Sequence, residues 1–128
     1  MSSAVVTLTL SKNAVTIIGE NGWRRFESFA QYPDGWAGGE GKSLSVGSVD
    51  TLEMFLRQLP ELAAYQPGLF LSHQGNLQLG WEDKSGAEVE IEFFPHKLEY
   101  FIESLQEEAE ISRERMSDLI EKVRSLLA

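Results

Sequence analysis

The sequence predicts an α+β fold: an antiparallel β-meander of about four strands packed with two or three helices, plus an N-terminal hairpin and a long C-terminal amphipathic helix. Residues 67–103 carry four short apolar runs separated by tight turns. Apolar residues recur at helical spacing on both sides of that stretch. The chain has 128 residues, 42% of them hydrophobic, which suits one domain with its own core. We therefore expect a single domain over residues 1–128.

The N-terminal region combines a β-rich segment with a short helical one. Residues 1–20 are predicted to form a hairpin, with strands at 4–10 and 14–18 that are rich in β-branched residues. Aromatic residues then recur at helical spacing, which predicts a helix over 22–31 with Asn21 as its cap.

Residues 21–66 are expected to hold helices and a glycine-rich loop. The loop at 35–43 is predicted to be a flexible or tightly turned surface segment. Ser48 is placed to cap the next helix, which Pro60 limits because proline cannot continue a helix. Residues 61–65 are long enough for one more turn.

The meander occupies residues 67–103. Its turns are short, and short connections favour antiparallel neighbours. The predicted strands are 69–71, 76–81, 87–94 and 98–102.

Residues 104–128 return to helical spacing and predict one long helix. Apolar and small residues alternate in steps of four and three, which is the seam of a heptad repeat. The seam consists of Leu105, Ala109, Ser112, Met116, Leu119, Val123 and Leu126. Two interpretations are open: the helix docks on the domain's own sheet, or it forms a homodimer through this seam.

Eight of the nine net negative charges lie in residues 82–110, which hold ten acidic residues and two lysines. Along residues 87–93, apolar and acidic residues alternate, so the two sets point to opposite faces of a strand. The apolar set is Val89, Ile91 and Phe93, and the acidic set is Glu88, Glu90 and Glu92. The acidic row, with a repeat of about 7 Å, is either an ordinary solvated face or a surface that imitates one edge of a nucleic-acid backbone.

No catalytic, cofactor or metal motif is present. The glycine-rich loop is comparable to a phosphate-binding loop, but that motif needs glycine five positions before Gly41, where the chain has Trp36. There is no cysteine, and His73 and His96 lie alone in predicted turns. We expect no catalytic residue, no cofactor and no metal.

Residues 33–102 resemble a loosely defined set of small, mostly uncharacterised bacterial and phage proteins. The resemblance rests on the Pro33–Gly38 loop (P-D-G-W-A-G), a helix ending Leu59-Pro60, the strand Gly75–Trp81 (G-N-L-Q-L-G-W), and the acidic hairpin from Glu88 to Phe101. It implies an α+β domain with helices against an antiparallel sheet. It also implies antitoxin or anti-defence proteins, such as anti-CRISPR proteins, and supplies no catalytic residues.

We therefore expect a non-enzymatic acidic protein that acts as a stoichiometric inhibitor of a protein partner with a basic, nucleic-acid-binding surface. Direct nucleic-acid binding is not expected, because the charge is repulsive. The expected contact residues are Glu82, Asp83, Glu88, Glu90, Glu92 and Glu99. A dimeric scaffold acting through the C-terminal helix is the alternative, and a small nucleotide-binding enzyme ranks last. No signal peptide or membrane-spanning run is visible, so a cytoplasmic location is expected.

Overall fold

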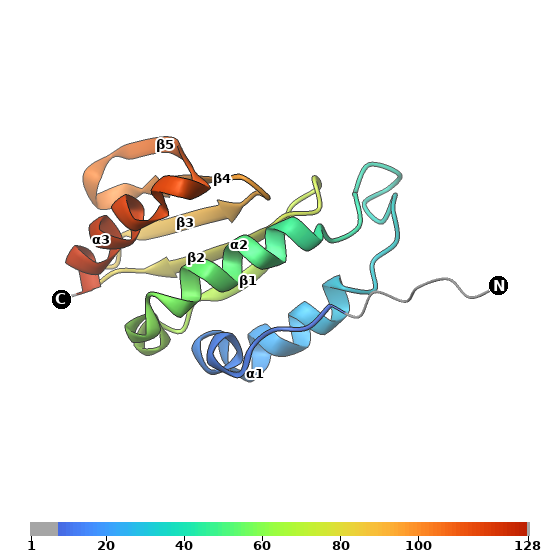
Figure 1. Cartoon of the computed structure of the whole chain (residues 1–128), viewed down its shortest axis with the longest axis horizontal. Helices are drawn as coiled ribbons and strands as arrows, with labels where there is room; N and C mark the ends of the chain where they lie inside the picture. Colours follow the sequence, from blue (N-terminus) through green and yellow to red (C-terminus); the bar gives the residue numbers. More distant parts are fainter. Residues whose placement is uncertain (1–7, 128) are drawn as a thin grey trace.

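The computed structural model describes residues 8–127. It contains a five-stranded antiparallel sheet that is covered by helices on one face (Figure 1). The helices are α1 (Lys12–Phe29), α2 (Val46–Arg57) and α3 (Met116–Leu127), with short 3-10 helices η1 (Pro60–Tyr65), η2 (Glu103–Leu105) and η3 (Arg113–Arg115). The strands are β1 (Gly68–Leu71), β2 (Leu77–Glu82), β3 (Glu88–Phe93), β4 (Lys97–Ile102) and β5 (Glu107–Ser112). The α+β class predicted from the sequence is confirmed.

The strands follow one another in sequence order, β1-β2-β3-β4-β5, so the sheet is a simple meander. The four predicted strands are confirmed, and β5 is a fifth that was not predicted. The register aligns Leu79 with Ile91 and Ile91 with Tyr100, and these three residues are buried beneath the helices. Because side chains alternate along each strand, the residues between them point to the other face of the sheet.

The core lies between this sheet and the helices. Phe55 of α2 packs edge-to-face on Phe93 of β3, with ring centroids 5.3 Å apart, and both side chains are fully buried. Leu119 and Val123 of α3 add to the same core. In Figure 1, α2 and α3 lie in front of the sheet, while α1 runs beside β1.

The predicted strand at 14–18 is wrong, because these residues form the first part of α1. The Ser11 hydroxyl accepts a hydrogen bond from the Ala14 amide at 3.1 Å, which caps the helix. Ala14, Ile17 and Ile18 are buried at helical spacing, so tertiary burial overrides the strand preference of the two β-branched isoleucines. Of the other predicted strand, at 4–10, residues 4–7 lie outside the described residues, and residues 8–10 are not in a strand. The predicted helix at 22–31 corresponds to the second half of α1, beyond a kink at Gly19 (φ 72°).

The helix α2 begins three residues earlier than predicted. Ser45, rather than Ser48, is the cap, and its hydroxyl accepts a hydrogen bond from the Ser48 amide at 3.3 Å. The buried Ser48 hydroxyl instead accepts from the Leu77 amide at 2.8 Å and so joins α2 to β2. The extra turn expected after α2 is present as η1.

The single long helix predicted over 104–128 is wrong in its first half, where the chain forms η2, β5 and η3. A left-handed Gln106 (φ 48°) closes the turn that lets β5 pair with β4. The predicted self-association seam therefore does not form one surface. Met116, Leu119 and Val123 are buried in the domain's own core, Leu126 is half-buried, and Leu105 and Ala109 are exposed on other elements.

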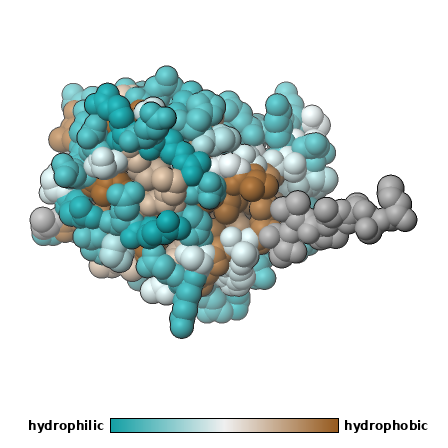
Figure 2. Space-filling view, viewed as in Figure 1, coloured by the Kyte–Doolittle hydropathy of each residue, from teal (hydrophilic) through white to brown (hydrophobic). Residues whose placement is uncertain are grey.

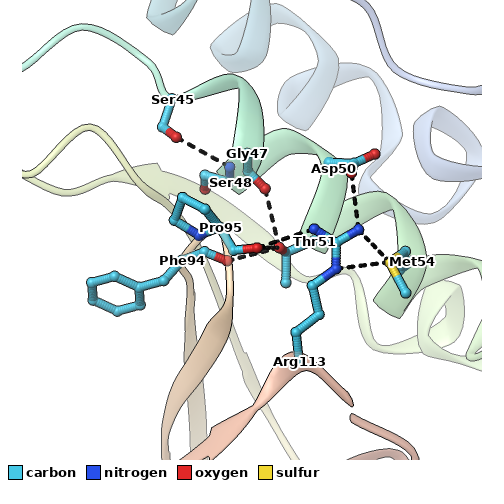
Figure 3. Close-up of polar contacts among 9 residues, drawn as sticks. All are labelled: Ser45, Gly47, Ser48, Asp50, Thr51, Met54, Phe94, Pro95 and Arg113. Atoms are coloured by element: carbon cyan, nitrogen blue, oxygen red, sulfur yellow. Dashed lines mark hydrogen bonds and ion pairs between the residues drawn. The ribbon is translucent and has the colours of Figure 1, made fainter. Parts of the chain in front are cut away.

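Polar contacts from α2 hold the β3–β4 turn and the start of η3 in place (Figure 3). The Thr51 hydroxyl donates to the Phe94 carbonyl at 2.7 Å. The Arg113 guanidinium donates to the Pro95 carbonyl at 3.0 Å and to the Asp50 carboxylate at 2.9 Å. These contacts fix the hairpin whose other face carries the candidate site.

Candidate functional site: the open face of the sheet

The face of the sheet that no helix covers, called the open face below, is strongly acidic. Its strands present seven glutamates and one lysine, a net charge of minus six, compared with minus nine for the whole chain. Two phenylalanines share this face. The charged residues are Glu82, Glu88, Glu90, Glu92, Glu99, Glu108, Glu110 and Lys97, and the aromatic ones are Phe70 and Phe101.

The strand register places like charges directly opposite one another. Glu82 pairs with Glu88, Glu92 with Glu99, and Glu99 with Glu110. Like charges at directly opposed positions destabilise a sheet. A solvated face needs only polar residues, so the folding of this domain does not account for such a concentration of carboxylates.

Several side chains hold the carboxylates of the open face in fixed positions. Lys97 lies between Glu110 and Glu99, with its ammonium 2.8 Å and 3.0 Å from their carboxylates. The hydrogen bonds to Glu110 and Glu99 raise the pKa of Lys97, and the same bond to Lys97 lowers the pKa of Glu110. The Glu92 carboxylate accepts hydrogen bonds from the side-chain amide of Gln78 at 3.1 Å and from the side-chain amide of Asn76 at 3.2 Å. These carboxylates are therefore oriented before any partner arrives.

The open face is hollowed rather than flat. A depression of about 370 Å³ runs from β1 to β5, lined by carboxylates and by the two phenylalanines. Gly80 contributes to its depth because a Cβ there would lie 3.7 Å from the Phe70 ring and 3.9 Å from the Glu90 side chain. The Phe70 side chain, 45% exposed, forms one end of the depression.

Five of the six predicted contact residues lie on the open face: Glu82, Glu88, Glu90, Glu92 and Glu99.

Asp83 does not share this face and instead shapes the β2–β3 turn. Its carboxylate accepts hydrogen bonds from the Ser85 hydroxyl at 2.6 Å, the Ser85 amide at 2.9 Å and the Ala87 amide at 3.1 Å. The Ser85 hydroxyl is the main cause that lowers the pKa of Asp83.

Sequence reasoning missed Glu108, Glu110, Phe70 and Phe101 as members of the open face. Glu108 and Glu110 fell in the stretch interpreted as helix. The alternation of acidic and apolar residues from Glu108 to Ile111 is the signal that could have placed them on a strand. Phe101 lies next to Tyr100, so the apolar pair hid the alternation of β4.

The glycine-rich loop at 35–43 is tightly turned, and most of its backbone amides bond within the protein. The Lys42 amide donates to the His73 carbonyl at 2.9 Å, and the Ser43 amide donates to the Asp34 carboxylate at 2.8 Å. Amide groups engaged in this way do not form the cradle that a phosphate needs. Among residues 8–127, no three histidine, aspartate or glutamate side chains are arranged to hold a metal ion.

Outside the charged residues of the open face, the chain carries thirteen acidic and ten basic residues, so the two signs are nearly balanced. Figure 2 shows that hydrophilic side chains cover most of the helix-covered side, interrupted by separate apolar areas. In the described part of the chain, no helix is both long and apolar enough to cross a membrane.

No known protein family, curated protein or solved structure matches this chain. The resemblance of residues 33–102 to bacterial and phage proteins stays a prediction, and the open face has to be interpreted from its own chemistry.

Proposed function

We propose that this protein is a non-enzymatic interaction protein whose open face binds and blocks the basic surface of a protein partner, as a stoichiometric inhibitor does. The observation that carries the proposal is the net charge of minus six on one uncovered sheet face, where the register opposes like charges. Carboxylates that destabilise the free sheet become favourable when a basic surface covers them. Such charges mainly raise the rate and the specificity of association.

The spacing of the carboxylates supports a partner that ordinarily binds nucleic acid. Glu88, Glu90 and Glu92 repeat about every 7 Å along β3. The phosphates of a nucleic-acid strand likewise form a regular row of negative charges, so a carboxylate row suits the same kind of basic groove. Glu108 and Glu110 form a second row on β5, two strands and about 10 Å away. A groove built to bind phosphates is the complementary surface.

The proposal is tested by removing the β3 row without changing the fold. The triple variant Glu88→Gln, Glu90→Gln, Glu92→Gln loses three negative charges from the open face. The control triple, Glu27→Gln, Glu40→Gln, Glu121→Gln, loses three from exposed positions elsewhere. Each protein is immobilised and used to capture partners from a lysate of the source organism, at increasing salt.

We expect the wild type and the control triple to retain the same partner and the β3 triple to lose it. The captured partner, once purified, should release its nucleic acid when one equivalent of the wild-type protein is added. If the β3 triple retains the same partner with the same salt dependence as the wild type, the open face is only a solvated surface and the proposal fails.

The other two functions considered from the sequence lose support. A dimeric scaffold needs the C-terminal seam, yet Met116, Leu119 and Val123 are buried in the core. A nucleotide-binding enzyme needs free amides in the 35–43 loop, and the Lys42 and Ser43 amides are bonded within the protein.

A further inference from the structure

Phe101 occupies an unusual position in the open face. The register aligns it with Glu90 of β3 on one side and Glu108 of β5 on the other. Directly opposed side chains in an antiparallel sheet have Cβ atoms about 5 Å apart. A flat cation placed on the Phe101 ring would therefore lie within reach of a carboxylate on each side. Gly80 continues the same line across β2 and, having no side chain, adds no bulk beside Glu90.

The protein itself uses the matching contact elsewhere. At the β1 edge, the guanidinium of Arg25 lies 5.0 Å from the centroid of the Phe70 ring, and at the β3–β4 turn the Lys97 ammonium lies 4.7 Å from the Phe94 ring. Within residues 8–127, no such cation lies over the Phe101 ring, although this ring has a carboxylate on each side. A cation of the protein therefore covers the Phe70 ring, whereas the Phe101 ring is available for a cation from a partner.

The chemistry of the depression favours arginine over the other possible occupants. A metal ion lacks a set of three ligands among the described residues, and an apolar ligand would desolvate carboxylates without pairing them. Lysine carries a compact, strongly hydrated charge. The guanidinium group is planar, less hydrated, able to stack on an aromatic ring and able to bond carboxylates with several N–H groups at once.

We propose that the depression in the open face is an arginine-binding site, in which a guanidinium group of the partner stacks on Phe101 and donates hydrogen bonds to Glu90 and Glu108. The inference rests on the proposed function and specifies the partner: a protein that presents an arginine-rich segment, rather than any basic surface. The proposed site differs from nonspecific attraction of cations to the acidic face because it requires charge and shape to match at the Phe101 ring.

The test compares two peptides of equal charge. Each has eight cationic residues in the same glycine and serine background, arginine in one and lysine in the other, and binding is measured by calorimetry at physiological salt. We expect the arginine peptide to bind the wild-type protein about two- to fivefold more tightly, the range of one exposed cation–π contact. Phe101→Leu should abolish this preference and leave lysine-peptide binding unchanged. Phe29→Leu on α1, the same substitution outside the depression, should keep it.

A second pair of variants separates the flanking carboxylates from net charge. Glu90→Gln with Glu108→Gln removes both neighbours of Phe101, whereas Glu82→Gln with Glu88→Gln removes the same charge from the end of the face. The arginine preference should fall only in the first double variant. Equal effects of the two doubles would overturn the inference.

The outcomes for the inference and for the proposed function are distinct. If both peptides bind the wild type equally, with salt dependence and with loss in the β3 triple, the arginine site is overturned while the acidic interaction surface stands. If neither peptide binds, the arginine site is again overturned, and the capture experiment alone decides the proposed function.

Discussion

The two faces of one sheet follow opposite rules, and β3 shows both within six residues. Val89, Ile91 and Phe93 lie beneath the helices and are almost fully buried. Glu88 and Glu90, which alternate with these residues, are exposed and face other carboxylates or the open depression. The helix-covered face supplies the apolar burial that stabilises the domain, and the open face opposes it by charge repulsion. The opposed carboxylates of the open face lower the stability of the fold, so folding does not explain them. For this reason we propose that the open face binds the partner.

The two edges of the sheet differ in a similar way. Arg25 of α1 closes the β1 edge by donating to the Leu69 carbonyl at 3.0 Å. The β5 edge instead carries the exposed glutamates Glu108 and Glu110. Charged residues on an edge strand discourage pairing with a second copy of the same chain. The charges of β5 therefore disfavour edge-to-edge pairing of two copies of the chain.

The two faces should differ most in how a substitution changes the free energy of unfolding, and the largest loss is expected at Phe93. Phe93→Ala removes a fully buried ring that packs on Phe55, which should lower the free energy of unfolding by about 3–5 kcal/mol. Urea denaturation measures the loss. The neighbouring Glu90→Gln on the open face should unfold at the wild-type urea concentration or slightly above it. A loss below about 1 kcal/mol for Phe93→Ala would contradict this core.

A smaller loss is expected where α2 holds the β3–β4 turn. Arg113→Met removes the hydrogen bonds to the Pro95 carbonyl and the Asp50 carboxylate and should cost about 1–2 kcal/mol. Arg115→Met is the matched control, because its ion pair with Asp118 is largely exposed and should contribute less than about 0.5 kcal/mol. Equal effects of the two substitutions would show that Arg113 is an ordinary surface residue.

The open face should gain stability when one of its opposed charges is removed. Glu88→Gln relieves repulsion with Glu82 and should raise the free energy of unfolding by roughly 0.2–0.5 kcal/mol. Glu27→Gln on α1 should have no comparable effect. Because exposed charges are screened, the gain should shrink in 1 M salt. Destabilisation by Glu88→Gln at low salt would remove the argument that the face opposes folding.

The smallest effect is expected at the contact between α3 and the sheet, where Glu107 accepts hydrogen bonds from Lys122 and from the Tyr100 hydroxyl. The bond to Lys122 is the main cause that lowers the pKa of Glu107. A lowered pKa in the folded state contributes stability above the unfolded pKa of about 4.3, and this contribution is lost as the pH falls through the folded value. Glu107→Gln should therefore slightly lower the melting temperature at pH 7, and the difference from the wild type should shrink below pH 4.

Local pattern was enough to predict the four-strand meander, because β1 to β4 combine apolar runs with tight turns. The same alternation correctly separated Val89, Ile91 and Phe93 from Glu88, Glu90 and Glu92. It was not enough for β5, because this edge strand buries little and its glutamates and alanine are good helix formers. The first half of α1 failed for the opposite reason, since β-branched residues there are buried on a helix.

The sequence by itself determined the α+β class, the acidic window and the direction in which the β3 carboxylates point. Only the tertiary structure decided which carboxylates meet. The positions of Glu90, Phe101 and Glu108 beside one another depend on the register of three strands. A shift of one residue would send each side chain to the other face, and the register is held by burial of apolar residues on the far side of the sheet. The arrangement of the acidic depression is therefore fixed by apolar packing on the opposite, helix-covered face of the sheet.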